Sequence, residues 1–151
     1  MGIVQECSIC NGSADLTFKR IEVWKNDTWR LTMSTFSEVR GFCYLEPIKH
    51  IEYITDLDGK EADEFGKILS FASKAIKKAT GAKLVYVYIF GDHVPHLHVH
   101  LAPHFDGDNY VDDVIKSEIN IREDVMRDEE QFKLRSKTKS ELLQLYASSI
   151  L

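Results

Sequence analysis

The chain lacks both a long apolar segment and an excess of basic residues. It has 151 residues, and 24 acidic side chains against 19 Lys and Arg give a formal net charge of −5. Sequence-independent binding to a nucleic-acid polymer needs a surface rich in Lys and Arg, so we expect no nucleic-acid partner. No stretch approaches the length of a membrane span, and residues 1–7 do not resemble a signal peptide. We therefore expect no membrane contact and a soluble, cytoplasmic protein with a single core.

Cysteine is also scarce, with Cys7, Cys10 and Cys43 only. An odd number in a chain of this size argues against a disulfide framework. Cys7 and Cys10 form a C-x-x-C pair, and the Asn-Gly-Ser sequence that follows does not favour the helix start of a redox pair. Metal binding is the better interpretation. Two thiolates at this spacing can bind one Zn²⁺, which then needs two more ligands, and His50 and His96 are the candidates.

Alternating apolar residues and turn signals predict a sheet in the first third of the chain. Residues 18–24 and 28–33 are expected to be strands of a hairpin, with Asn26-Asp27 in the turn. Residues 41–46 form a third apolar run, which Pro47 ends because it lacks a ladder donor.

The middle of the chain predicts a long helix followed by a strand. Apolar residues at helical spacing run from Ala62 to Ala79, Asp58 is placed to cap the start, and Gly81 suits the end. Residues 84–90 are apolar at every position, which predicts a central strand covered on both faces. After a charged segment, Leu142 and its apolar neighbours predict a helical tail.

Three histidines at alternate positions, His96, His98 and His100, are the most informative feature of the sequence. On a β-strand they would share one face, with Leu97, Val99 and Leu101 on the other. Three interpretations are open at this point. The imidazoles could be structural, they could converge on a zinc ion, or one of them could be a nucleophile toward phosphorus with its neighbours stabilising charge.

The segment from His96 to Ala102 resembles the signature of the histidine triad (HIT) family, and residues 41–50 resemble the segment that precedes it there. The resemblance implies an α+β fold with a mainly antiparallel five-stranded sheet, a long helix packed on it and a helical C-terminal tail. It further implies a homodimer. We expect residues 1–106 to be the histidine triad domain and residues 107–151 to be a helical extension of the same domain.

The resemblance also implies chemistry at the α-phosphate of a nucleotide. The substrate would be a nucleoside phosphoramidate or a dinucleoside polyphosphate, and His98 would form a covalent nucleotidyl intermediate. His100 would contact phosphate oxygens, and Asp92, His93 and His96 are further candidates for the phosphate or the leaving group. Zinc-containing members of the family would place one structural zinc on a ligand set that here corresponds to Cys7, Cys10, His50 and His96.

The sequence departs from the family pattern at two places. Ser34 stands where many members carry the acidic residue that holds ribose, with Glu38 or Asp27 as possible substitutes. Gly91-Asp92-His93 stands where many have Gly-Gln-Ser or Gly-Gln-Thr. Two alternatives therefore stay open: a metallohydrolase with a catalytic zinc on the three histidines, and a nucleotide-binding module without catalysis.

Overall fold

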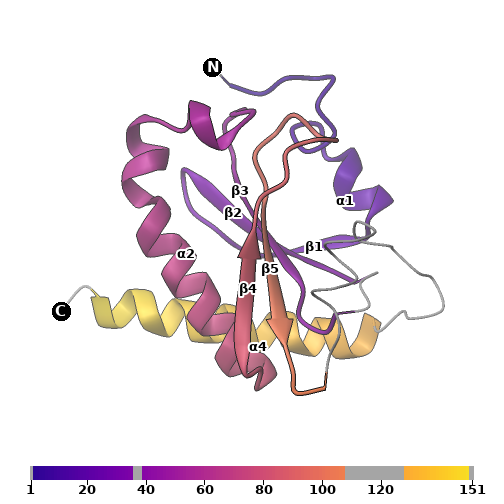
Figure 1. Cartoon of the computed structure of the whole chain (residues 1–151), viewed down its shortest axis with the longest axis vertical. Helices are drawn as coiled ribbons and strands as arrows, with labels where there is room; N and C mark the ends of the chain where they lie inside the picture. The colour runs from indigo at the N-terminus through magenta and orange to yellow at the C-terminus, as the bar shows by residue number, and fades with distance from the viewer. Residues whose placement is uncertain (1, 36–38, 108–127, 150–151) are drawn as a thin grey trace.

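The chain folds around one five-stranded antiparallel sheet (Figure 1). The structure, a computed structural model, describes residues 2–35, 39–107 and 128–149. The strands lie in the order β1-β2-β3-β5-β4. Their bounds are Arg20–Lys25 (β1), Trp29–Ser34 (β2), Cys43–Pro47 (β3), Leu84–Tyr88 (β4) and Val99–His104 (β5). With the helices described below, this confirms the expected α+β class.

The predicted hairpin is β1 and β2, and Asn26 shapes its turn. The side-chain oxygen of Asn26 accepts hydrogen bonds from the backbone N–H of Thr28 at 2.9 Å and of Trp29 at 2.8 Å. Asn and Asp favour turns because they can bond their own backbone in this way. The pairing register shifts between Glu22 and Trp24, where a β-bulge bends the strand.

The long helix α2 spans Gly59–Thr80, and its two ends follow the sequence signals. The carboxylate of Asp58 accepts a hydrogen bond from the Gly59 N–H at 2.8 Å. At the other end Gly81 has a φ of 74°, a left-handed conformation that glycine adopts without strain. The other helices are α1 (Ser13–Thr17), the 3₁₀ turn η1 (Ile54–Asp56) and α4 (Asp128–Ser149).

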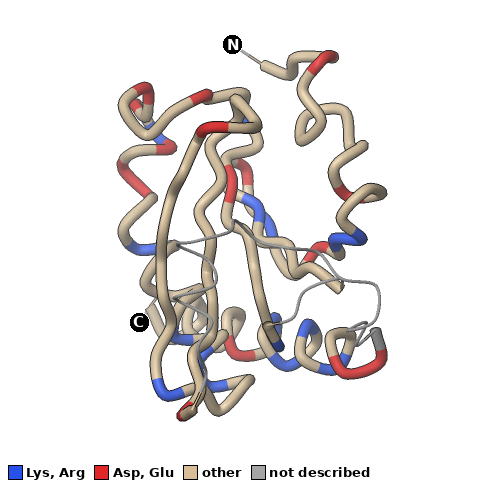
Figure 2. The backbone as a smooth tube through the Cα atoms, turned by 45° about the vertical axis from the view of Figure 1, so that its right-hand side comes forward, with Lys and Arg blue, Asp and Glu red and all other residues tan. Residues whose placement is uncertain are grey.

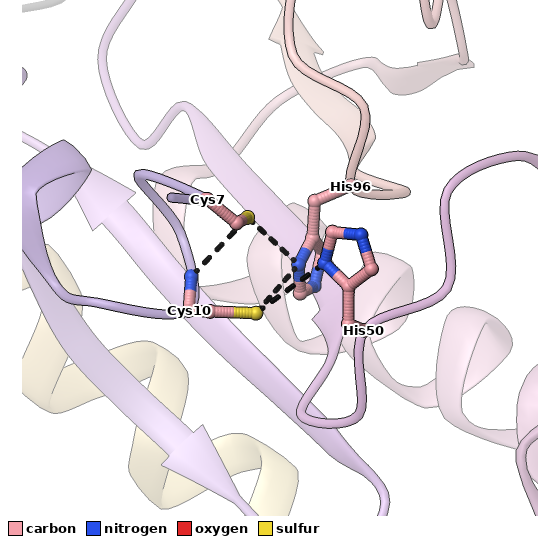
Figure 3. Close-up of side chains that lie close together, drawn as sticks. All are labelled: Cys7, Cys10, His50 and His96. Carbon is pink, nitrogen blue, oxygen red and sulfur yellow. Dashed lines mark hydrogen bonds between the residues drawn. The ribbon is translucent and has the colours of Figure 1, made fainter. Parts of the chain in front are cut away.

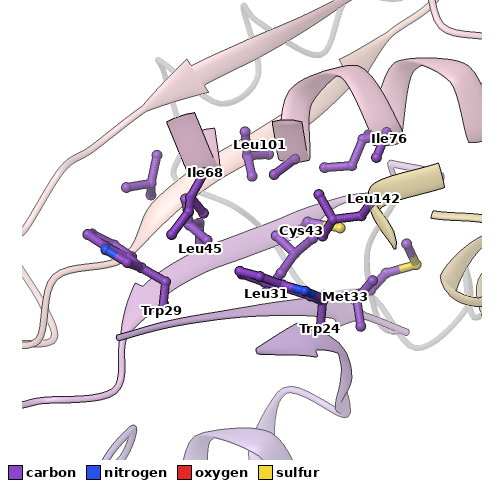
Figure 4. Packing of buried hydrophobic residues seen from close by; sticks show 14 of the residues in the cluster. Trp24, Trp29, Leu31, Met33, Cys43, Leu45, Ile68, Ile76, Leu101 and Leu142 are labelled. Atoms are coloured by element: carbon purple, nitrogen blue, oxygen red, sulfur yellow. The ribbon is translucent and has the colours of Figure 1, made fainter. Parts of the chain in front are cut away.

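Both long helices cover the same face of the sheet. Strand side chains from Leu31, Leu45 and Leu101 are buried there against Ile76 of α2 and Leu142 of α4 (Figure 4). The Trp24 ring of β1 stacks on Tyr146 of α4 with ring centroids 5.2 Å apart. The C-terminal helix is therefore part of the main core, which confirms the helical tail. Within the described part of the chain, no helix combines the length and apolar character needed to cross a bilayer.

The expectation that residues 84–90 form a central strand is wrong, because β4 lies at the edge of the sheet. Leu84 is 38% exposed and Val87 is 43% exposed. An apolar run shows only that both faces of a strand meet apolar surroundings, and it does not give the number of neighbouring strands. Here Tyr88 on one face stacks on His100 of β5, while Val85 on the other packs against the core.

The face of the sheet that the long helices leave uncovered carries polar side chains. Alternation along the strands places Arg30 of β2 and Glu46 of β3 on this face, opposite Leu31 and Leu45. Figure 2 shows basic and acidic residues meeting on neighbouring strands near the middle of the molecule. The N-terminal segment and α1 lie against this face, because Asp15 of α1 forms an ion pair with Arg30.

Candidate active site and metal centre

Two cysteines and two histidines from three distant segments meet beside the sheet (Figure 3). The Sγ atom of Cys7 lies 3.4 Å from Nδ1 of His96, and Sγ of Cys10 lies 3.4 Å from Nδ1 of His50. The four possible ligand atoms all lie within 4.8 Å of one another. The sequence prediction that Cys7, Cys10, His50 and His96 come together thus agrees with the structure.

The surroundings of this cluster fit a structural zinc ion. The Nε2 atom of His96 lies 2.8 Å from the carbonyl oxygen of Pro47, so Nε2–H donates and Nδ1 is left for a metal. Burial lowers the pKa of His96, which favours the neutral imidazole that a metal ligand requires. Burial also raises the pKa of the Cys10 thiol, a cost that coordination to a cation can offset. Two sulfurs and two imidazole nitrogens are a common zinc ligand set.

The three triad histidines do not all lie on one strand, which corrects the sequence expectation. Strand β5 begins only at Val99, so His100 alone of the three lies in it. Before the strand, the His96 N–H donates to the Val94 carbonyl at 2.8 Å, and the chain bends there. His96 consequently points into the cysteine cluster. His98 and His100 still point the same way, with ring centroids 5.0 Å apart.

A backbone carbonyl bonds one ring nitrogen of His98 and leaves the other nitrogen without a backbone partner. Its Nδ1 lies 2.7 Å from the carbonyl oxygen of His96, so Nδ1–H donates and Nε2 carries the lone pair. His98 is only partly buried and lines a pocket. A neutral imidazole with an accessible Nε2 is the form that acts as a nucleophile.

His100 lies beside His98 within aromatic rings. It stacks on Tyr88 with centroids 4.5 Å apart and an interplanar angle of 7°, and its Nδ1 lies 3.2 Å from the Tyr88 carbonyl oxygen. Phe42 and Phe90 lie within 6.0 Å, centroid to centroid. Burial, reinforced by the nearby His98, lowers the pKa of His100 to about 3. His100 is therefore neutral at physiological pH.

His98 and His100 open into a pocket of about 180 Å³. Asp92 and His93, from the loop between β4 and β5, also line it, as the prediction of a leaving-group role requires. The other described lining residues are Ser8, Ile9, Ala14, Phe18, Arg20, Tyr44, Phe90, Gly91 and Val94.

Some sequence candidates lie elsewhere. His96 does not line the pocket, so the structure gives it no phosphate-binding position and leaves it with the cysteines. Ser34 and Asp27 are also outside the lining, and the Ser34 hydroxyl donates to the Phe18 carbonyl at 3.3 Å. The proposed ribose substitute Glu38 lies outside the described residues.

Arg20 and Tyr44 form the floor of the pocket, and Arg20 there belongs to a network of charged residues that the sequence analysis missed. Arg20 of β1 donates two hydrogen bonds to the Glu46 carboxylate, both at 2.9 Å, and two to Asp15 Oδ1, at 3.0 and 2.8 Å. Arg30 bonds the same two carboxylates, at 2.6 Å for Asp15 and 3.4 Å for Glu46. Despite burial, these two guanidinium groups hold the pKa of Asp15 below its usual value. The sequence of β3 did indicate a polar face, because Tyr44 and Glu46 alternate there with the core residues Cys43 and Leu45.

Comparisons with known proteins agree with this geometry. The family model of the HIT domain matches residues 19–107, more than half of the chain. The chain therefore belongs to the HIT domain family. No curated protein matches it.

Solved structures of histidine triad proteins share the fold. A hypothetical histidine triad nucleotide-binding protein from Sulfolobus tokodaii is 22% identical with a TM-score of 0.68, over 90% of this chain and 93% of that one. A zinc-bound histidine triad family protein from Mycobacterium smegmatis is 16% identical with a TM-score of 0.68, over 95% and 98%. A Hit-like protein from Bartonella henselae is 20% identical with a TM-score of 0.67, over 91% and 99%.

Proposed function

We propose that this protein cleaves or transfers nucleotidyl groups, with His98 as the nucleophile. The substrate would be a nucleoside phosphoramidate or a dinucleoside polyphosphate. The observation that carries this proposal is the 2.7 Å contact between His98 Nδ1 and the His96 carbonyl, because it makes Nε2 the ring nitrogen available to a ligand in the pocket. Membership of the HIT family supports the substrate class.

The reaction would proceed in two displacements at the α-phosphorus. The lone pair of His98 Nε2 forms a bond to phosphorus, and the bond to the leaving group breaks, with its electron pair departing on the leaving atom. The His96 carbonyl continues to accept from Nδ1–H and stabilises the positive charge on the ring. Water then attacks phosphorus and loses a proton, while the bond between phosphorus and Nε2 breaks and its electron pair returns to Nε2, so His98 regains its neutral form. Another acceptor in place of water would give transfer.

His100 and the loop between β4 and β5 would serve the phosphate and the leaving group. A bound phosphate favours the protonated form of a neighbouring imidazole, so His100 would bind it as an imidazolium despite being neutral when free. His93 and Asp92 line the pocket rim, where His93 could supply the proton that a departing amine or phosphate takes up.

Cys7, Cys10, His50 and His96 would hold one structural zinc ion per chain. The zinc would link the N-terminal segment to the start of the histidine motif and would take no part in the displacement. The alternative of a catalytic zinc on all three triad histidines has no geometric support, because both ring nitrogens of His96 are already engaged by the cysteine cluster and Pro47.

We also propose a cytoplasmic homodimer in which residues 107–151 extend the histidine triad domain. The exposed Leu84 and Val87 on the edge strand β4, and Phe90 just after it, support a partner at that edge. The buried Leu134 and Leu142 of α4 support an extension that shares one core with residues 1–106. Sedimentation over a range of concentrations tests the dimer.

Trapping of the intermediate tests the catalytic proposal. The protein is incubated with adenosine and guanosine phosphoramidates and the matching dinucleoside polyphosphates, quenched in mild base and digested. We expect mass spectrometry to find a nucleotidyl group on His98 and none in His98→Ala. Nucleotide binding without an adduct or turnover would instead identify a non-catalytic binding module.

A further inference from the structure

The hydroxyl of Tyr44 faces the pocket with no partner among the described residues. Tyr44 is 9% exposed, and it lines the pocket between the catalytic histidines and Arg20. Tyr44 forms no hydrogen bond with its hydroxyl to a described residue, and its side chain lines the pocket. A polar atom that is otherwise surrounded by protein and opens only into a pocket is placed to bind a ligand.

The surroundings of Tyr44 make this hydroxyl a hydrogen-bond donor. Burial raises the pKa of Tyr44 above its usual value, so the hydroxyl keeps its proton. The guanidinium carbon of Arg20 lies 5.3 Å from the centroid of the Tyr44 ring, and the Tyr44 ring packs edge-on against His100 at 5.4 Å. The ring is thus fixed in orientation by its neighbours.

Arg20 offers a second donor to the same space. A guanidinium group has five N–H bonds, and Arg20 uses four of them on Asp15 and Glu46. The remaining N–H is on Nη1, and Arg20 lines the pocket.

The carboxylates beside Arg20 accept from guanidinium groups and do not line the pocket. Glu46 is 1% exposed and accepts from both Arg20 and Arg30, and Asp15 accepts from the same two residues. Asp15, Glu22 and Glu46 together offset the positive charges of Arg20 and Arg30. The floor therefore offers hydrogen-bond donors without an uncompensated positive charge.

We propose that Tyr44 and Arg20 form a donor site that binds an oxygen acceptor on the nucleotide part of the substrate. Tyr44 is then a substrate-binding residue that also sets specificity, since a ligand group that can only donate there, such as an ammonium N–H, gains nothing from it. The proposal rests on the proposed nucleotidyl function. It assigns the nucleotide to the floor and the leaving group to the loop between β4 and β5.

Tyr44→Phe tests the site, since it removes the hydroxyl and keeps the ring contacts. Calorimetry measures the affinity of the zinc-loaded protein for AMP and GMP. Turnover is measured with a phosphoramidate and a dinucleoside polyphosphate of the same nucleoside. We expect Tyr44→Phe to weaken monophosphate binding about 10-fold and to lower kcat/KM by the same factor for both substrates, with kcat nearly unchanged.

Tyr86→Phe is the matched control, because Tyr86 lies on the same face of the sheet, on β4, but outside the pocket lining. A Tyr44→Phe protein that binds and turns over like Tyr86→Phe would overturn the inference. The inference would also be overturned if kcat/KM fell for only one of the two substrates, because Tyr44 would then contact the leaving group and not the nucleotide. A wild-type protein that binds neither monophosphate would reject the nucleotidyl function itself, together with this site.

Discussion

His96 and His98 are two residues apart, yet they donate hydrogen bonds to backbone carbonyls from different ring nitrogens. In His96, Nε2–H donates a hydrogen bond to the Pro47 carbonyl, which leaves Nδ1 for the cysteine cluster. In His98, Nδ1–H donates a hydrogen bond to the His96 carbonyl, which leaves Nε2 for the pocket. The carbonyl that each ring meets selects its tautomer, and under the proposed function the tautomer selects between zinc ligand and nucleophile.

The two regions also differ in what surrounds the rings. The cysteine cluster joins three segments far apart in sequence, so it holds the chain together. The pocket places His98 and His100 against aromatic rings, beside the ion pair of Arg20 and Glu46, and leaves Nε2 of His98 without a backbone partner. If the cysteine cluster and the pocket are separate sites, a substitution in the pocket leaves the zinc content unchanged, and a substitution in the cluster leaves His98 in place.

The largest effect is expected from His98→Ala. Loss of the nucleophile should lower kcat by at least about 1000-fold, because the covalent route is removed. Zinc content, measured by plasma mass spectrometry, should stay at the wild-type level, because His98 contributes no atom to the cluster. Zinc lost together with activity would show that the two histidines share one site.

Cys7→Ser makes the reciprocal change. Zinc content should fall to near zero, and the melting temperature should fall by about 10 °C, because metal binding stabilises the folded state. Cys43→Ser is the control, since Cys43 is a buried core thiol outside the cluster. A Cys7→Ser protein that keeps its zinc would contradict the ligand set.

A smaller effect is expected from pH, through His100. Its pKa of about 3 in the folded state is below the unfolded value, so the unfolded chain binds more protons in the acidic range. The contribution of His100 is therefore fully present above about pH 6.5 and is lost as pH falls from there toward 3, by up to about 1.4 kcal/mol per pH unit. Denaturant unfolding between about pH 7 and pH 5 should show a shallower pH dependence in His100→Gln than in wild type. Equal slopes would contradict a neutral buried His100.

Local signals explain what the sequence predicted well. Asn26 marks the hairpin turn, and Asp58 and Gly81 mark the two ends of α2, because each acts through backbone groups only a few residues away. The cysteine cluster was predictable for a different reason. Few side chains bind zinc, and the family pattern gave their pairing.

Features that depend on distant partners were not predictable in this way. The edge position of β4 depends on which strands pair, and a run of apolar residues carries no such information. The separation of His96 from the other triad histidines depends on the Pro47 carbonyl, 49 residues earlier in the chain. Arg20 of the pocket floor and the buried Glu46 form their ion pair only after β1 and β3 are placed in one sheet.

The smallest effect concerns the second histidine of the cluster, His50. Its Nε2 lies 3.6 Å from Oε1 of Glu52, a half-exposed carboxylate that can orient the ring while Nδ1 faces Cys10. Glu52→Gln should weaken zinc affinity about 3-fold to 10-fold in a competition titration with a chelator, and kcat of the zinc-loaded protein should not change. Glu6→Gln, an exposed carboxylate beside Cys7 in sequence, is the control for a general loss of negative charge. An equal effect in both variants would mean that Glu52 acts only through its charge. A specific loss in Glu52→Gln would extend the rule for His96 and His98 to His50: the partner of one ring nitrogen decides what the other nitrogen binds.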